Sequence, residues 1–181
     1  MKPARSLLVA VAALALLLGA RPIAGPEQFP RGLMASAAPR AGGGRLCTIE
    51  TRPLSFGIYD PLAETDVDAT AQIIYTCVKR SGSGDGGDSA QAIRIELRQG
   101  LQNAFAPRKM MGPGTGLEYN IYLDATRQTI WGNGVDITQA YIDTHPPNGT
   151  PVIVPVFGRI FGRQDPEPGQ YYDSVIAAIF F

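Results

Sequence analysis

The chain has 181 residues, of which 45% are hydrophobic, and its 16 basic and 16 acidic residues give no net charge. The basic residues are scattered, which excludes the basic face that phosphate backbones require, so we expect no nucleic-acid partner. Beyond the N-terminal hydrophobic segment about 160 residues remain, enough for one domain with its own core.

A hydrophobic segment follows two positive charges at the N-terminus. Lys2 and Arg5 precede the stretch Ser6 to Ala20, which consists mostly of Leu, Val and Ala. This pattern predicts a secretory signal peptide over residues 1–20, removed on export. The apolar run of about 15 residues is shorter than the roughly 20 that a membrane-spanning helix needs. We therefore expect a secreted chain with no transmembrane segment in its mature part.

The next segment, residues 21–45, is rich in Pro, Gly, Ala and Arg, and it ends in three consecutive glycines followed by Arg45. Such a density of helix and strand breakers leaves no room for a regular element of useful length. We expect an extended N-terminal arm that leads into the domain.

Two cysteines, Cys47 and Cys77, follow the arm. An exported chain reaches an oxidising compartment, where a pair of thiols is usually bonded, so the sequence predicts one disulfide. Closing a loop of this length should remove roughly 3 to 4 kcal/mol of unfolded-state entropy.

From Leu46 onward, apolar and polar residues alternate with the period of half-buried strands. No segment has a sustained helical period, and turn-forming stretches rich in Gly, Pro and Asn separate the alternating ones. The pattern predicts an all-β sandwich or barrel over residues 46–181. The expected strands are 67–77, 93–97, 117–123, the one that begins at 152–156, and Tyr171 to Phe181.

The last expected strand is apolar on both faces from Val175 to Phe181. A strand of that kind lies inside a sheet with a neighbour on each side. Either an earlier strand of the chain pairs there, or the neighbour comes from another molecule.

The sequence indicates no catalytic, metal or cofactor site, so we expect no enzyme. His145 is the single histidine and lies in a turn-like stretch, and no Gly-x-Ser-x-Gly elbow supplies a nucleophile for it. Asp66 and Asp68 alone offer too few oxygens for calcium. The glycine-rich loop 82–88 is a single copy of a calcium-binding pattern that requires stacked repeats.

Trp131, with Tyr119 and Tyr122 nearby in the sequence, has the composition of a sugar-stacking platform. Burial of Trp131 in the core at the end of a strand is the interpretation that we favour, because Trp is usually buried. Met110 and Met111 are likewise expected to fill the core.

Several motifs resemble those of the spore coat protein U domain family. They are CTI at Cys47, PLSFGIYDP at 53–61, IIYTCVK around Cys77, RKMMGPGTGLEYNIYLDATRQTIWGNG, and VPVFGRIFGRQDPEPGQYYDSVIAAIFF. The resemblance covers residues 46–181, which is the whole expected domain. The family includes the subunits of archaic, Csu-type chaperone-usher pili as well as the coat protein after which it is named.

The resemblance implies an incomplete immunoglobulin-like β-sandwich that lacks its last strand. The gap is filled first by a periplasmic chaperone and then by a donor segment of the neighbouring pilus subunit. An outer-membrane usher is the third implied partner, and the cell surface, reached through the periplasm, is the implied location. The resemblance also implies a disulfide, consistent with Cys47 and Cys77. The groove for the chaperone or donor strand would be lined by Leu54, Phe56, Ile58, Val175, Ala177, Ile179 and Phe181.

The arm departs from the donor segment that polymerising members of the family carry ahead of the first cysteine. Its one apolar register is interrupted by Arg31, and Pro30 and Pro39 limit ladder hydrogen bonds. The residues in that register are Phe29, Leu33, Ala35 and Ala37.

A subunit that accepts a strand but gives none would sit at the end of a fibre. Our first hypothesis is a structural subunit of a surface pilus. The alternatives are a tip adhesin or binding module that uses loops such as 81–88 or 132–150, and a non-fimbrial spore or cell coat protein with a closed sandwich.

Overall fold

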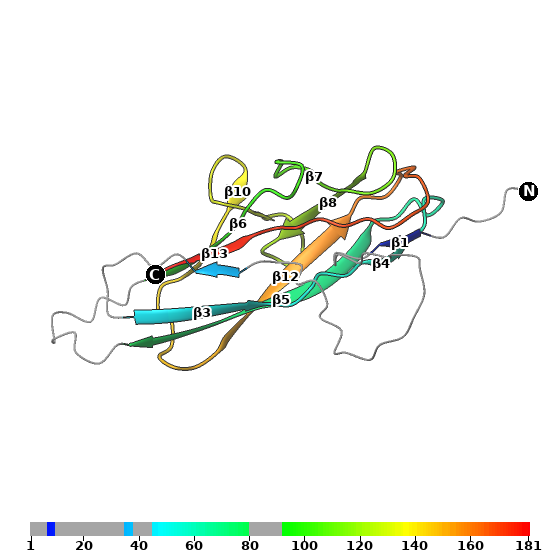
Figure 1. Cartoon of the computed structure of the whole chain (residues 1–181). Coiled ribbons are helices and arrows are strands. Elements are labelled where there is room, and N and C mark those ends of the chain that lie inside the picture. The colour runs from blue at the N-terminus through cyan, green and yellow to red at the C-terminus, as the bar shows by residue number, and fades with distance from the viewer. Residues whose placement is uncertain (1–6, 10–34, 38–44, 80–91) are drawn as a thin grey trace, which may run out of the picture.

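The computed structural model describes residues 7–9, 35–37, 45–79 and 92–181, and these residues form strands, turns and bends but no helix. Most of the expected signal peptide and arm lies outside the described residues, as does the expected loop at 81–88. Figure 1 shows the strands arranged along one long axis. The all-β prediction is confirmed for the part of the chain that the structure describes.

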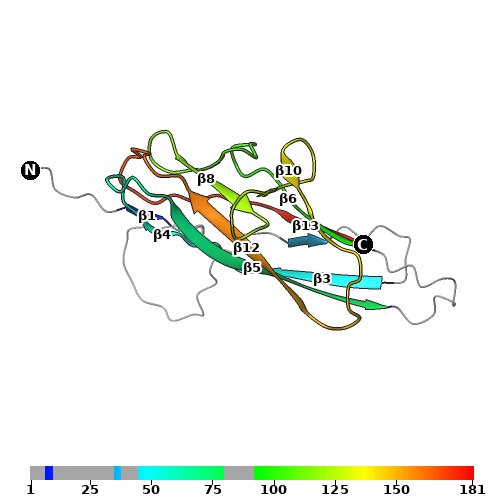
Figure 2. The same cartoon turned by 180° about the vertical axis from the view of Figure 1, so that it is seen from behind.

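The larger sheet has seven strands, in the order β10–β9–β8–β12–β5–β3, with β7 pairing on β8. Its centre is the antiparallel pair β5 and β12, in register from Val152 opposite Tyr75 to Ile160 opposite Val67. Figure 2 shows this pair crossing the face of the molecule. The strands of this sheet are β3 Arg45–Thr51, β5 Val67–Lys79, β7 Arg108–Met110, β8 Leu117–Tyr122, β9 Ile130–Trp131, β10 Thr138–Gln139 and β12 Val152–Ile160.

The smaller sheet has four strands, in the order β11–β6–β13–β2. Its third strand, β13, is antiparallel to β6 on one side and parallel to β2 on the other. The strands of this sheet are β11 Tyr141–Asp143, β6 Ile93–Leu97, β13 Ala177–Phe180 and β2 Ala35–Ala37.

A separate antiparallel pair joins β1, Leu7–Val9, to β4, Gly57–Tyr59. The three residues of β1 fall within the predicted signal peptide. Removal of that peptide on export would leave β4 without this partner.

The predicted alternation places the core between the two sheets. In β6, Ile93, Ile95 and Leu97 are buried, while Arg94 and Glu96 between them are half-buried. The face of β5 that carries Ala71, Ile73, Tyr75 and Cys77 is buried in the same way. Two facing sheets of this kind form an immunoglobulin-like β-sandwich, as predicted.

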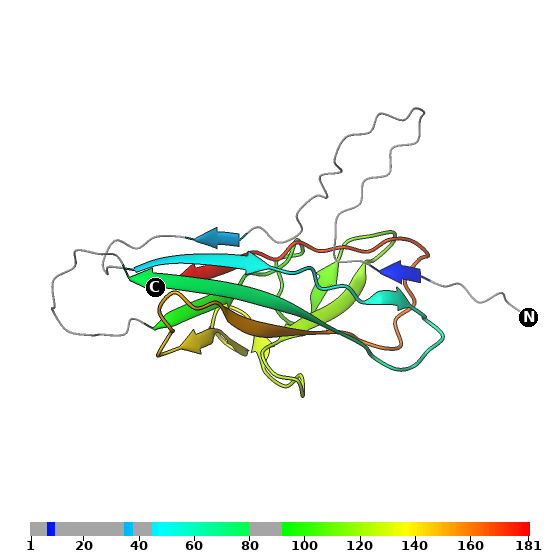
Figure 3. The same cartoon turned by 90° about the horizontal axis from the view of Figure 1, so that it is seen from below.

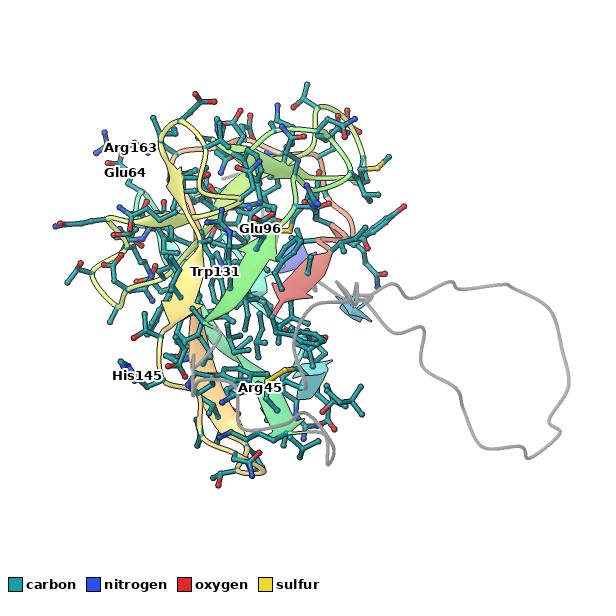
Figure 4. The ribbon with its side chains drawn as sticks, turned by 90° about the vertical axis from the view of Figure 1, so that its left-hand side faces the viewer. Arg45, Glu64, Glu96, Trp131, His145 and Arg163 are labelled. Carbon is teal, nitrogen blue, oxygen red and sulfur yellow. A yellow bond between two sulfur atoms is a disulfide. The ribbon has the colours of Figure 1, made fainter. Side chains whose placement is uncertain are left out.

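Trp131 lies inside this sandwich, fully buried, and its Nε1 donates a 3.0 Å hydrogen bond to the Ile95 carbonyl (Figure 4). Its expected place in the core is confirmed. Of the two methionines expected beside it as core filler, Met110 is fully buried, whereas Met111 is 39% exposed and the prediction is wrong for it.

The last strand is shorter than expected. The sequence predicts a strand from Tyr171, but β13 begins at Ala177, and Tyr172 makes only an isolated bridge with Met111. The cause is Asp173, which is buried and accepts hydrogen bonds from the backbone N–H groups of Leu101 and Ser174. These bonds hold the chain ahead of β13 against a loop rather than in a ladder.

Candidate functional site

The apolar C-terminal strand supplies one wall of the candidate site. Ala177 and Ile179 of β13 are fully buried, Val175 just ahead of them is 3% exposed, and Phe181 packs partly buried against the core. On one side β13 pairs with β6, where Ile179 lies opposite Ile95. On its other side, within the part of the chain that the structure describes, it pairs with the three residues of β2 alone.

The segment that follows β3 supplies the facing wall. Leu54 and Phe56 are buried, and the Phe56 ring meets the Tyr119 ring edge-on with 6.0 Å between centroids. A Cβ on Gly158 would lie 2.6 Å from Leu54 Cδ2 and 2.7 Å from Phe56 Cζ. Glycine at this position of β12 therefore lets both side chains lie directly on the strand.

Between these walls lies a cavity of about 20 Å³ with no polar surface in its lining. Leu54 and Val175 face it from the two walls, and Ala71 and Ile73 of β5 form part of its floor. The full lining is Arg52, Leu54, Ala71, Ile73, Leu97, Tyr119, Ile121, Val156 and Val175. A small empty space of this kind stays dry and lacks van der Waals partners, so an added apolar side chain would be stabilised there. We call this cavity and the adjoining edge of β13 the apolar groove.

The structure brings together most of the residues that the sequence assigns to the groove. Leu54 and Val175 line the cavity, and Phe56, Ala177 and Ile179 belong to the same buried core cluster. Phe181 packs against that cluster from the chain end. Ile58 is not brought to the groove, because it is 55% exposed on β4, where its backbone pairs with Leu8 of β1.

A buried polar pair fixes the end of the groove ahead of β13. Tyr119 lines the cavity, and its hydroxyl donates a 2.6 Å hydrogen bond to Asp173 Oδ2. Burial raises the pKa of Tyr119 well above its usual value, and the Asp173 carboxylate adds to the effect. A Cβ on Gly100 would lie 1.8 Å from the same carboxylate, so the missing side chain makes room for it.

A second buried group is Arg108, whose burial the sequence pattern does not predict. Its guanidinium is fully buried and donates 2.7 Å hydrogen bonds to Asn120 Oδ1 and to the Trp131 carbonyl. Burial lowers the pKa of Arg108, and the charges of Tyr119 and Asp173 act in the opposite direction. Its position in β7, flanked in the sequence by Pro107 and Lys109, carries no signal of burial. For Asp173 the sequence gives one weak indication of burial, since it is a single carboxylate within an aromatic and apolar run.

The disulfide lies at the edge of the larger sheet. Cys47 of β3 and Cys77 of β5 are directly opposite in the antiparallel ladder, and their sulfur atoms are bonded. The bond therefore ties the edge strand β3 to the centre of its sheet.

The remaining polar candidates have ordinary structural surroundings. Asp66 and Asp68 form ion pairs with Arg159 at 3.2 and 2.8 Å, and Asp68 forms another with Arg127 at 3.1 Å. The hydrogen bond from Arg159 is the main reason that the pKa of Asp68 is lowered. His145 is exposed, and its ring contacts only the neighbouring Thr144 hydroxyl among the bonds of the described residues (Figure 4).

The described residues offer neither a metal-binding cluster nor a membrane-spanning helix. They contain no group of three or more His, Cys, Asp or Glu side chains placed to hold a metal ion. They also contain no helix that is long and apolar enough to span a membrane.

The chain is similar to a protein family, a curated protein and a solved structure. The family model of the Spore Coat Protein U domain matches residues 40–178. Protein U of Myxococcus xanthus is 29% identical over 154 residues, which are 78% of this chain and 74% of Protein U.

The third similarity is to a crystal structure, the CsuC–CsuE chaperone–tip adhesion subunit pre-assembly complex from archaic chaperone-usher Csu pili of Acinetobacter baumannii. It has a TM-score of 0.48 and 20% sequence identity, and the match covers 76% of this chain. The chain spans 40% of the length of that neighbour.

Proposed function

This chain belongs to the Spore Coat Protein U domain family, and from that premise we propose that it is a structural subunit of a surface pilus, built by the chaperone-usher route. Its fold is completed by donor-strand complementation, in which a strand from another molecule pairs with β13. A periplasmic chaperone supplies that strand first, and a neighbouring subunit replaces it at an outer-membrane usher. The chain then passes through the periplasm to the cell surface.

The observation that carries this proposal is the apolar groove. A sheet edge with unpaired N–H and C=O groups beside an uncovered core is a template for an added strand. Among the described residues, the outer edge of β13 is paired only with the short strand β2, which covers three of its four residues, and an apolar cavity adjoins Val175. An incoming apolar strand would supply main-chain hydrogen bonds to β13 and side chains for the cavity.

The proposal is tested by chaperone capture. The change Ile179→Asp places a carboxylate at a fully buried position of β13, and we expect co-purification with a periplasmic chaperone to be lost. Ile153→Asp is the matched control, because Ile153 is 59% exposed on β12. Capture of the Ile179→Asp variant at the level of the control would contradict the proposal.

Because Asp at position 179 also weakens the core of the subunit itself, a milder variant is measured beside it. Val175→Ala enlarges the cavity without adding charge. A folded Val175→Ala variant should be captured several-fold less well, because the shortened side chain loses van der Waals contacts with the incoming strand. Unchanged capture of this variant would exclude the cavity from the contact with the chaperone strand.

One further observation favours a second candidate function, a binding module at a fibre tip. The loop between β9 and β10 exposes Val135 and Ile137, by 56% and 68%. The loop is held in a fixed shape, since the Thr138 hydroxyl donates to the Val135 carbonyl at 2.8 Å. Asp136 between the two apolar residues adopts a positive φ of 56°. Apolar side chains on a rigid tip suit contact with a hydrophobic surface.

The double variant Val135→Ser/Ile137→Ser tests this second function. Retention of the protein on an octyl-coated resin should fall, while the thermal midpoint stays the same because both positions are exposed. Val78→Ser, a change of an exposed valine at the end of β5, serves as the control. Equal retention of the unchanged chain, the double variant and the Val78→Ser control would contradict the tip function.

A further inference from the structure

The chain pairs a piece of its own N-terminal arm with its last strand. Ala35 lies opposite Ala177, Ser36 opposite Ala178 and Ala37 opposite Ile179, all in a parallel register. Ala177 and Ile179 are the two fully buried positions of β13. The arm thus lies along the edge that the proposed function leaves for a strand of another molecule.

The short connection along the chain favours pairing within one molecule over pairing between two molecules. Only the residues 38–44 separate β2 from β3, and β3 is the edge strand of the larger sheet. Figure 3 shows β2 and β3 side by side along one margin of the sandwich. A tether of seven residues gives an effective concentration on the order of millimolar. At micromolar protein, the chain's own arm therefore outcompetes the arm of a second copy.

The pairing is also short. It covers three residues, and Pro39, which has no N–H to donate, follows two residues after its end. A donor strand that ran the full length of the groove would make more hydrogen bonds and also fill the cavity. The arm is therefore strong enough to cover the edge and weak enough to be displaced.

We propose that residues 35–37 act as an internal cap on β13, so that the free subunit is closed by its own arm until a longer strand displaces it. This inference rests on the proposed function for the identity of the displacing strand. Ala35 and Ala37 also belong to the single apolar register of the arm, which is the register of a donor. Capping and donation are then mutually exclusive, and release of the cap exposes the groove and frees the arm at once.

The cap is tested by cross-linking in the mature chain, residues 21–181. Ser36→Cys with Ala178→Cys places two cysteines opposite each other on adjacent strands, with backbones about 5 Å apart, which is within the Cα–Cα range of a disulfide. We expect an intramolecular bond, seen as a linked pair of peptides by mass spectrometry from a monomeric band. Ser36→Cys with Ser174→Cys is the control, because Ser174 lies four residues out of register and should not link.

Absence of the first cross-link would overturn the cap. A cross-link between two chains would overturn it as well, because the occupant of the edge would then be a second copy. The assay needs no chaperone, so its failure is separate from failure of the proposed function. A cross-linked monomer that no chaperone captures would support the cap and contradict the proposed role as a pilus subunit.

A binding assay gives an independent readout. Ser36→Pro removes the central N–H of β2 without touching the domain, and Gln28→Pro is the matched change elsewhere in the arm. The probe is a labelled peptide of residues 26–45. If the arm covers the edge nine-tenths of the time, Ser36→Pro should bind the peptide about tenfold more tightly than the unchanged chain. Equal affinities for the two chains would overturn the cap.

Discussion

The Tyr119 hydroxyl donates a 2.6 Å hydrogen bond to Asp173 Oδ2 inside the core, 54 residues away along the chain. Asp173 Oδ1 accepts from the backbone N–H groups of Leu101 and Ser174, each at 2.7 Å. One carboxylate thus fixes a loop, a ring that lines the cavity and the approach to β13.

Removal of the Asp173 carboxylate should lower the free energy of unfolding. Asp173→Ala leaves the Tyr119 hydroxyl buried without its partner and removes the acceptor of the Leu101 N–H, and we expect a loss of about 3 to 5 kcal/mol in the free energy of unfolding. Urea unfolding measures the change. Asp165→Ala, which removes an exposed carboxylate, should stay within about 0.5 kcal/mol. A similar small loss for both variants would refute the anchoring role of Asp173.

Alkaline pH should destabilise the fold through its buried tyrosines. Burial, followed by the Asp173 carboxylate, raises the pKa of Tyr119 in the folded state above its value in the unfolded chain. The unfolded chain therefore loses this proton first as the pH passes about 10. Stability should fall above that pH, by up to about 1.4 kcal/mol per pH unit for each such group.

The pH effect is measured by urea unfolding between pH 8 and pH 12. Tyr119→Phe should make the fall shallower, because it removes one of the groups responsible. Tyr172→Phe, a change at an exposed tyrosine, is the control. A fall of the same steepness in Tyr119→Phe would contradict the assignment to Tyr119.

Filling the cavity should have opposite effects on the free subunit and on strand binding. Ala71→Val adds two methyl groups at a position that lines the cavity, and it suits a strand. We expect the isolated subunit to gain on the order of 0.5 to 1 kcal/mol. Capture by the chaperone should weaken, since the space for an incoming side chain is reduced. Thermal unfolding and co-purification give the two readouts.

Thr70→Val is the matched control for this change, because Thr70 is the exposed neighbour of Ala71 on the same strand. It should leave capture unchanged. Loss of capture in both variants would show that the effect does not come from the cavity.

Loss of the disulfide should loosen β3, the edge strand of the larger sheet, first. Replacing both Cys47 and Cys77 by Ala removes the bond between β3 and β5 and should cost about 3 kcal/mol of stability in the chain-entropy model. Amide hydrogen exchange should accelerate more in β3 than in β12, since β12 is flanked by β5 and β8. Uniform acceleration in both strands would contradict a local role for the bond.

The sequence predicts the strands whose two faces differ. Alternation identified β6 over its exact length, from Ile93 to Leu97, and located β5, β8 and β12. It did not identify β9, β10 or β11, which have two or three residues each and are too short to show a period. Their position depends on pairing with distant strands, which local pattern does not contain.

The residues that line the cavity could be predicted only in part. Leu54 and Val175 were assigned from apolar residues on the first and last strands, and both line the cavity. Ile58 belongs to the same alternating stretch, but the alternation shifts at Gly57, which has a positive φ of 75°, so that Tyr59 is buried and Ile58 is exposed. Arg108 and Asp173 could not be foreseen, because a charged residue enters a core only when specific partners are folded around it.

The measurement that tests the central claim most directly is thermal unfolding of residues 21–181 with and without a strand fused after Phe181. The strand alternates apolar and polar residues and follows a flexible linker, and the control carries Asp at the apolar positions. If the groove accepts it, several kcal/mol of added pairing should raise the midpoint by roughly 20 °C relative to the control. If the unfused chain is a stable monomer and neither strand changes its midpoint, the sandwich is closed and a coat-protein role replaces the pilus subunit.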